Sequence, residues 1–121
     1  MTRVLLVEDH AALRQSLALL LEQMQGFRIV AHAGTGAEAR AAISEEETDV
    51  AVVDLGLPDA DGAEVIRNLR EAGPHLPVLV LTVHHDPEWH ARALQAGAKE
   101  VLTKDAGIEE VLRAIRCVAD G

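Results

Sequence analysis

The chain has 121 residues, of which 49% are hydrophobic and 26% are charged. This length and balance indicate one folded domain, residues 1–121, and exclude a disordered segment. The formal net charge of −9 argues against direct binding to nucleic acid, because an acidic surface repels phosphate backbones. The single cysteine, Cys117, rules out an internal disulfide, and no apolar run is long enough to span a membrane. The apolar run after Met1-Thr-Arg3 is too short for a signal peptide, so we expect a cytoplasmic protein with no membrane contact.

Five short apolar runs, rich in valine, leucine and isoleucine, predict buried strands. They cover residues 3–7, 28–31, 50–53, 77–81 and 100–102. The third run leads directly into Asp54. An ionised carboxylate is costly to bury alone, so we expect Asp54 at the rim of the sheet.

Amphipathic segments separate the apolar runs and predict helices. The first carries leucines and a methionine at helical spacing, which we expect to face the core: Leu13, Leu17, Leu20, Leu21 and Met24. Thr35 and Glu38 have capping-box spacing and open the next helix. The last helix carries an apolar stripe, again expected to face the core: Ile108, Val111, Leu112, Ile115 and Val118.

Two more helices are marked by their first residues. Asp61 and Glu64 have the spacing of a second box-like start. Asp86 and Pro87 are typical of an N-cap and a first helical residue. Strand and helix therefore alternate five times with short connections, which is the pattern of right-handed βαβ units. We expect a doubly wound α/β fold with a five-stranded parallel sheet covered by helices on both faces.

Polar side chains follow four of the predicted strands: Glu8 and Asp9, then Asp54, Thr82 and Lys104. In open parallel sheets, ligands bind outside the carboxyl ends of the strands, at the point where the strand order reverses. One charged residue after a strand is usually a solvated loop residue. The coincidence at four strands predicts a functional site.

The chemistry of this site follows from its charges. Neighbouring carboxylates repel one another by roughly 4 kcal/mol per pair at 4 Å and an effective dielectric near 20, so a cation is needed to hold them together. Oxygen ligands with hydrated positions favour Mg²⁺ over zinc. Lys104 and Thr82 suit the stabilisation of a phosphoryl group, with Asp54 as the nucleophile that forms an aspartyl phosphate.

The whole chain resembles a response-regulator receiver domain of a two-component system. The matching motifs are Val7-Glu8-Asp9-His10, Val53-Asp54-Leu-Gly-Leu-Pro58 with the later Gly62, Leu81-Thr82 and Leu102-Thr-Lys104. The resemblance implies the strand order 2-1-3-4-5, characteristic of flavodoxin-like folds. It also implies a signalling module rather than a turnover enzyme.

The resemblance implies residue roles and partners as well. Asp54 accepts phosphate from a sensor histidine kinase, and Thr82 and Lys104 are the switch and catalytic residues. Asp9 and Asp54 ligate Mg²⁺ directly, Glu8 acts through water, and Gly56 offers its carbonyl. Asp105 and Ala106 after Lys104 resemble the NarL/FixJ-like branch, in which a helix-turn-helix domain binds DNA. We expect homodimerisation, and DNA contact only through such a domain, which is missing from these residues.

Four positions tune the expected behaviour. Val101 stands where the family usually has tyrosine or phenylalanine, whose rotation reports phosphorylation, so coupling to output is expected to be weakened or altered. Val83 replaces a small residue and narrows access to Asp54. Gly56 and His84 occupy positions that the resemblance links to phosphate lifetime. Asp105, in place of a common proline, predicts a trans bond after Lys104.

Other functions remain in view. A haloacid-dehalogenase type phosphohydrolase would carry a second acid two residues after Asp54, where Gly56 stands. A flavodoxin-like cofactor site would be repelled by Glu8 and Asp9. The alternative that stays open is a pseudo-receiver or stand-alone interaction module with weak phosphorylation coupling, which the Val101 substitution favours.

Overall fold

The computed structural model describes residues 1–24, 26–54, 62–82 and 85–120, and for Asp54 it describes the backbone alone. Within these ranges the strands are β1 (Thr2–Glu8), β2 (Phe27–Ala33), β3 (Val50–Asp54), β4 (Val78–Thr82) and β5 (Glu100–Thr103). The helices are α1 (Ala11–Glu22), α2 (Gly36–Glu45), α3 (Gly62–Ala72), α4 (Pro87–Ala96) and α5 (Ile108–Asp120).

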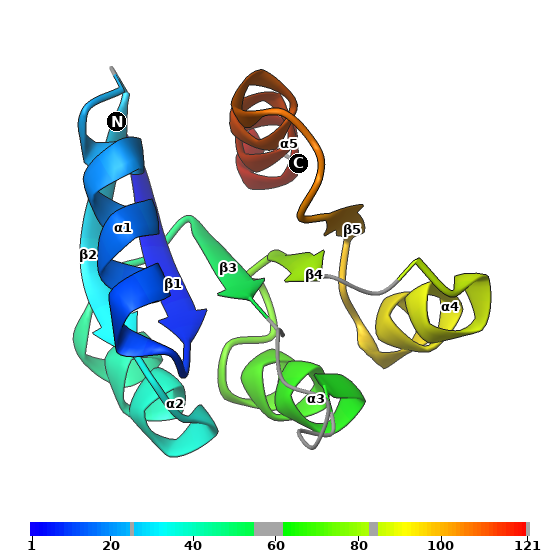
Figure 1. Cartoon of the computed structure of the whole chain (residues 1–121). Helices are drawn as coiled ribbons and strands as arrows, with labels where there is room; N and C mark the ends of the chain where they lie inside the picture. The colour runs from blue at the N-terminus through cyan, green and yellow to red at the C-terminus, as the bar shows by residue number, and fades with distance from the viewer. Residues whose placement is uncertain (25, 55–61, 83–84, 121) are drawn as a thin grey trace.

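The strands form one parallel sheet in the order β2-β1-β3-β4-β5. Figure 1 shows α1 and α5 on one face of this sheet and α2, α3 and α4 on the other. The predicted fold and strand order are therefore confirmed. Within the described ranges, no helix is long and apolar enough to cross a membrane.

The core consists of two apolar layers, one on each face of the sheet. Successive side chains of a strand point to opposite faces, and β1 follows this rule. Val4 and Leu6 pack with α1 and α5, whereas Leu5 and Val7 pack with the helices of the other face. Both layers are almost fully inaccessible to water, which explains why the central strands are apolar throughout.

The predicted helix starts are confirmed where the structure describes them. The Thr35 hydroxyl accepts a hydrogen bond from the Glu38 N–H at 3.1 Å, and the Glu38 carboxylate accepts one from the Gly34 N–H at 3.1 Å. Asp86 caps α4 through the Glu88 N–H, with Pro87 at the first helical position. Asp61, the predicted start of α3, lies outside the described residues.

The predicted inward stripes of α1 and α5 are wrong at three positions. Leu13 is 49% exposed, Leu20 37% and Ile108 36%. The reason is that α1 packs on β1 and β2, whereas α5 packs on β3, β4 and β5. The two helices leave a groove of about 360 Å³ between them, and Leu13, Leu20 and Ile108 are among the residues that line it.

Candidate functional site

Backbone pairing brings the predicted site residues to one edge of the sheet. Glu8 lies opposite Asp54 in the register of β1 and β3, and Asp54 lies opposite Leu81, next to Thr82 at the end of β4. Thr82 in turn lies opposite Thr103 of β5, and the Lys104 N–H donates to the Thr82 carbonyl at 2.7 Å. Four strands therefore deliver Glu8, Asp54, Thr82 and Lys104 to their shared carboxyl edge.

Glu8 and Lys104 meet across this edge. The Lys104 Nζ lies 4.0 Å from the Glu8 Oε2, although β3 and β4 separate the strands that carry them. The lysine side chain therefore extends across the ends of the two middle strands, where Asp54 and Thr82 lie. Glu8 is 2% exposed and Thr82 is fully buried. A carboxylate at such depth is costly unless a cation and hydrogen bonds offset its desolvation.

Asp9 lies in the turn between β1 and α1, and unlike Glu8 it is exposed. The turn is tightly bonded around it. The Glu8 Oε1 accepts a hydrogen bond from the His10 N–H at 3.0 Å, and the His10 Nδ1 caps α1 by accepting one from the Leu13 N–H at 3.4 Å. The Arg14 Nη1 donates to the Glu8 carbonyl at 2.7 Å.

Arg14 was not singled out from the sequence. An arginine near the start of a predicted helix is usually a solvated residue. No sequence pattern indicates that Arg14 contacts Glu8. Only the packing of α1 beside the end of β1 brings its guanidinium to the Glu8 carbonyl.

The Mg²⁺ ligands predicted from the sequence are only partly described. Among the described residues no group of three His, Cys, Asp or Glu side chains gathers around one point. The predicted set, however, includes the Asp54 carboxylate and the Gly56 carbonyl, which lie outside the description. The part that is described fits a hard cation, since a buried Glu8 and an exposed Asp9 offer oxygen donors at the same edge.

The loops after β4 and β5 meet at the side of the site. The His85 Nε2 lies 3.8 Å from the Asp105 Oδ2, and the Thr103 hydroxyl donates to the Asp105 Oδ1. The Thr103 hydrogen bond, followed by the charge of His85, holds the pKa of the Asp105 carboxyl below its ordinary value. The bond from Lys104 to Asp105 is trans, as predicted.

The predicted tuning positions have different outcomes. Val101 is half-buried, pairs with Val80 in the sheet and packs against the core layer of α2, α3 and α4. Gly56, Val83 and His84 lie outside the described residues, so their roles stay predictions.

The family is decided by a match over almost the whole length. The family model described as "Response regulator receiver domain" matches residues 4–116. The chain belongs to the response-regulator receiver family. This receiver spans about half the length of the curated relatives it matches. "Response regulator GacA" of Pseudomonas viridiflava is 36% identical over 121 residues, which are 100% of this chain and 56% of that protein.

Solved receiver-containing structures match this receiver closely. A two-component response regulator of the LuxR family from Aurantimonas sp. SI85-9A1 has a TM-score of 0.90 at 32% identity, covering 100% of this chain and 87% of that one. A response regulator protein from Burkholderia pseudomallei, solved with a phosphorylated aspartic acid, a calcium ion and citrate, has a TM-score of 0.82 at 28% identity. That match covers 99% of this chain and 69% of the other. The predicted likeness to the NarL/FixJ-like branch is confirmed by the LuxR-family match.

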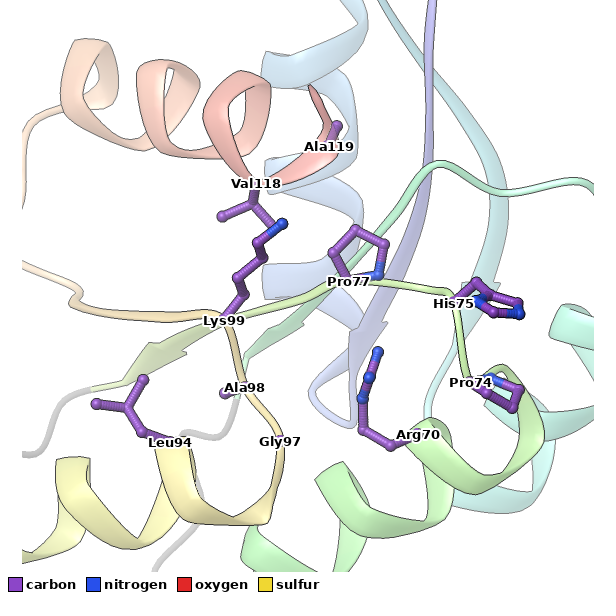
Figure 2. Close-up of a pocket in the computed structure, with 10 residues that line it drawn as sticks. All are labelled: Arg70, Pro74, His75, Pro77, Leu94, Gly97, Ala98, Lys99, Val118 and Ala119. Carbon is purple, nitrogen blue, oxygen red and sulfur yellow. The ribbon is translucent and has the colours of Figure 1, made fainter. Parts of the chain in front are cut away.

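A second pocket of the receiver lies at the opposite end of the sheet (Figure 2). It has a volume of about 470 Å³ and is bordered by Pro77 and Lys99, which immediately precede β4 and β5. Its basic side chains are Arg70, His75 and Lys99, and the Arg70 Nη1 is bonded to the Leu76 carbonyl at 2.7 Å. This pocket faces the amino ends of β4 and β5 and takes no part in the acidic site.

Proposed function

We propose that this receiver accepts a phosphoryl group on Asp54 from a sensor histidine kinase, in a reaction that depends on Mg²⁺. The observation that carries the proposal is the approach of Lys104 to Glu8, at 4.0 Å, across the strand ends that hold Asp54 and Thr82. A lysine and a buried acid that converge on that edge, beside Asp54 and Thr82, support a site for a phosphoryl group and its metal ion.

The chain's own residues divide the work of the transfer. Asp54 is the nucleophile: one of its carboxylate oxygens bonds to phosphorus while the bond from phosphorus to the donor imidazole nitrogen breaks. Charge is spread over the phosphoryl oxygens during this exchange. The Lys104 ammonium offsets that charge, and the Thr82 hydroxyl donates a hydrogen bond to it.

Oxygen donors hold the metal in this proposal. Asp9 and Asp54 would be direct ligands, Glu8 would act through water, and Gly56 would contribute its carbonyl. Bound Mg²⁺ supplies neutralisation of the clustered carboxylates and of the incoming phosphoryl group. The Burkholderia pseudomallei relative, which was solved with a phosphorylated aspartic acid and a calcium ion, supports this chemistry for Asp54.

Phosphorylation is proposed to act as a switch and not as a turnover reaction. The relatives named as response regulators, one of them in the LuxR family, support a signalling role. The protein proposed here is a cytoplasmic transcriptional regulator whose helix-turn-helix domain contacts DNA. Homodimerisation of the phosphorylated receiver is the proposed link between Asp54 and that output.

The test is the gain in intact mass after incubation with acetyl phosphate, with Mg²⁺ or with EDTA. Wild-type protein should gain one phosphoryl group only with Mg²⁺. Asp54→Asn should gain none, whereas Asp120→Asn, which changes an exposed acid at the end of α5, should behave as wild type. A folded wild-type protein that gains nothing would contradict the proposal.

The second candidate is a pseudo-receiver that binds partners without phosphorylation. The half-buried Val101 favours it, since a valine has no ring to rotate between two positions. The same mass experiment separates the two, because a pseudo-receiver stays unmodified.

A further inference from the structure

Arg14 is bonded to the strand end that precedes the acidic turn. It is half-buried in α1, and its Nη1 donates to the Glu8 carbonyl at 2.7 Å. The backbone of Arg14 also belongs to the turn, since its N–H donates to the His10 carbonyl at 3.0 Å. A charged donor makes a stronger bond to a carbonyl than a neutral one, and half-burial reduces competition from water.

The peptide groups on both sides of Asp9 are held. The Glu8 carbonyl, which belongs to the peptide bond before Asp9, is held by Arg14. The His10 N–H, which belongs to the peptide bond after Asp9, donates to the Glu8 carboxylate at 3.0 Å. The backbone of Asp9 is therefore fixed between two bonded peptides, although its side chain is exposed.

Gly34, the residue after β2, leaves the space that the Arg14 guanidinium occupies. A Cβ atom at position 34 would lie 2.7 Å from the Arg14 Nη1, closer than such atoms approach. The nearest atom it would meet is the far end of a flexible side chain, and the next is the Glu38 Oε1 at 3.3 Å, so an alanine could be accommodated by moving the guanidinium and shifting the Glu38 carboxylate slightly. The absence of a side chain at Gly34 thus permits the Arg14 bond to Glu8.

We propose that Arg14 is a positioning residue for the metal site: it fixes the Glu8–Asp9 peptide so that the Asp9 carboxylate is already oriented toward Mg²⁺. This inference rests on the proposed function. Residues that orient metal ligands typically change metal affinity by 10–100-fold when they are removed, although they never touch the ion.

Charge and positioning predict opposite signs for the loss of Arg14. Removing a cation near a Mg²⁺ site should tighten metal binding if charge alone matters. Removing a positioning residue should weaken it, because the Asp9 backbone must then be ordered at the moment of binding. The direction of the change in affinity therefore discriminates between the two effects.

The experiment measures the Mg²⁺ dissociation constant of the unphosphorylated protein, from the amide NMR shifts of Asp9 and His10 during a Mg²⁺ titration. Arg14→Met should weaken binding by about tenfold or more. Arg14→Lys, which keeps a donor, should recover part of the loss. Arg40→Met, which removes an exposed arginine of α2, should leave binding unchanged.

Gly34→Ala tests the same bond from the other side while keeping the charge of Arg14. It should weaken Mg²⁺ binding and speed hydrogen exchange at the His10 amide. In the double variant it should add little to the effect of Arg14→Met, because both changes break the same bond between Arg14 and Glu8. This variant also decides the matter if Arg14→Met fails to fold.

The outcomes separate this inference from the proposed function. If the wild-type protein binds Mg²⁺ and accepts phosphate while Arg14→Met and Gly34→Ala bind Mg²⁺ with wild-type affinity, the positioning role is wrong and the proposed function stands. If the wild-type protein shows no Mg²⁺ response, both are wrong.

Discussion

Glu8 is an acid with 2% of its surface exposed, at the end of a strand whose other inner residues are aliphatic. Such burial lowers stability unless hydrogen bonds and a nearby cation offset it. The His10 N–H, in the turn after β1, and the Lys104 ammonium, after β5, supply these contacts. At the residue scale, a backbone N–H and a lysine ammonium thus stabilise the buried Glu8 carboxylate.

A different ion pair makes stability depend on pH. Asp49 accepts hydrogen bonds from the Arg3 side chain, at 3.1 and 3.0 Å, and from the Arg3 N–H at 2.7 Å. These bonds, the side-chain ones first, hold the pKa of the Asp49 carboxyl below its ordinary value. A lowered folded-state pKa stabilises the protein above the unfolded pKa of about 3.9, and the contribution is lost as the pH falls below it.

Asp49→Asn should therefore lower the thermal midpoint by a few degrees at pH 7. The difference from wild type should stay constant down to about pH 5 and shrink below about pH 4. Thermal unfolding followed by circular dichroism at several pH values measures this, with Asp120→Asn as the control. If the loss of thermal midpoint in Asp49→Asn grew on acidification, the predicted direction of the pH dependence would be wrong.

Val101 tests the coupling between phosphorylation and output. If its lack of a ring weakens that coupling, Val101→Tyr should increase the gain in dimerisation that beryllofluoride and Mg²⁺ produce, measured by sedimentation equilibrium. Val101→Ile, which is also larger but has no ring, should not. An unchanged gain in Val101→Tyr would rule out the weakening idea.

At the scale of single elements, the turns between strands and helices are set by local hydrogen bonds. The α2 start shows this most completely, because Thr35 bonds the Glu38 N–H while Glu38 reaches back to the Gly34 N–H. Both residues were identified from spacing alone, since a capping box is a purely local pattern.

Thr35→Ala should destabilise the receiver by about 1 kcal/mol, which is typical for loss of an N-cap oxygen. Urea unfolding gives the free energy, and Thr35→Ser, which keeps the hydroxyl, should cost much less. Equal losses for both variants would mean that the threonine methyl group and not its oxygen is important.

Other features of the elements could not be read from spacing. Helical periodicity placed Leu13, Leu20 and Ile108 on core-facing stripes, but it could not predict that α1 and α5 would stand apart and leave these side chains in a groove. The exposure of a helical residue depends on the neighbouring element, which local sequence does not specify. The same holds for Arg14, whose role exists only because α1 packs beside the end of β1.

At the scale of the whole molecule, strand order creates the site. The order β2-β1-β3-β4-β5 places β1 and β3 side by side and brings Glu8 opposite Asp54, although 46 residues separate them in the sequence. The apolar runs and the polar residues after them predicted the fold class and the shared edge. The strand order and the individual roles came from the resemblance to the receiver family, because spacing alone does not choose among parallel topologies.

The central claim is that Asp54, at this edge of the sheet, accepts a phosphoryl group in a reaction that depends on Mg²⁺. The most direct measurement is to treat the protein with acetyl phosphate and Mg²⁺, reduce the acyl phosphate with borohydride, and locate the resulting homoserine by peptide mass spectrometry. Homoserine at position 54 alone, and only when Mg²⁺ was present, is the predicted result. Modification at another residue, or equal modification in EDTA, would contradict it.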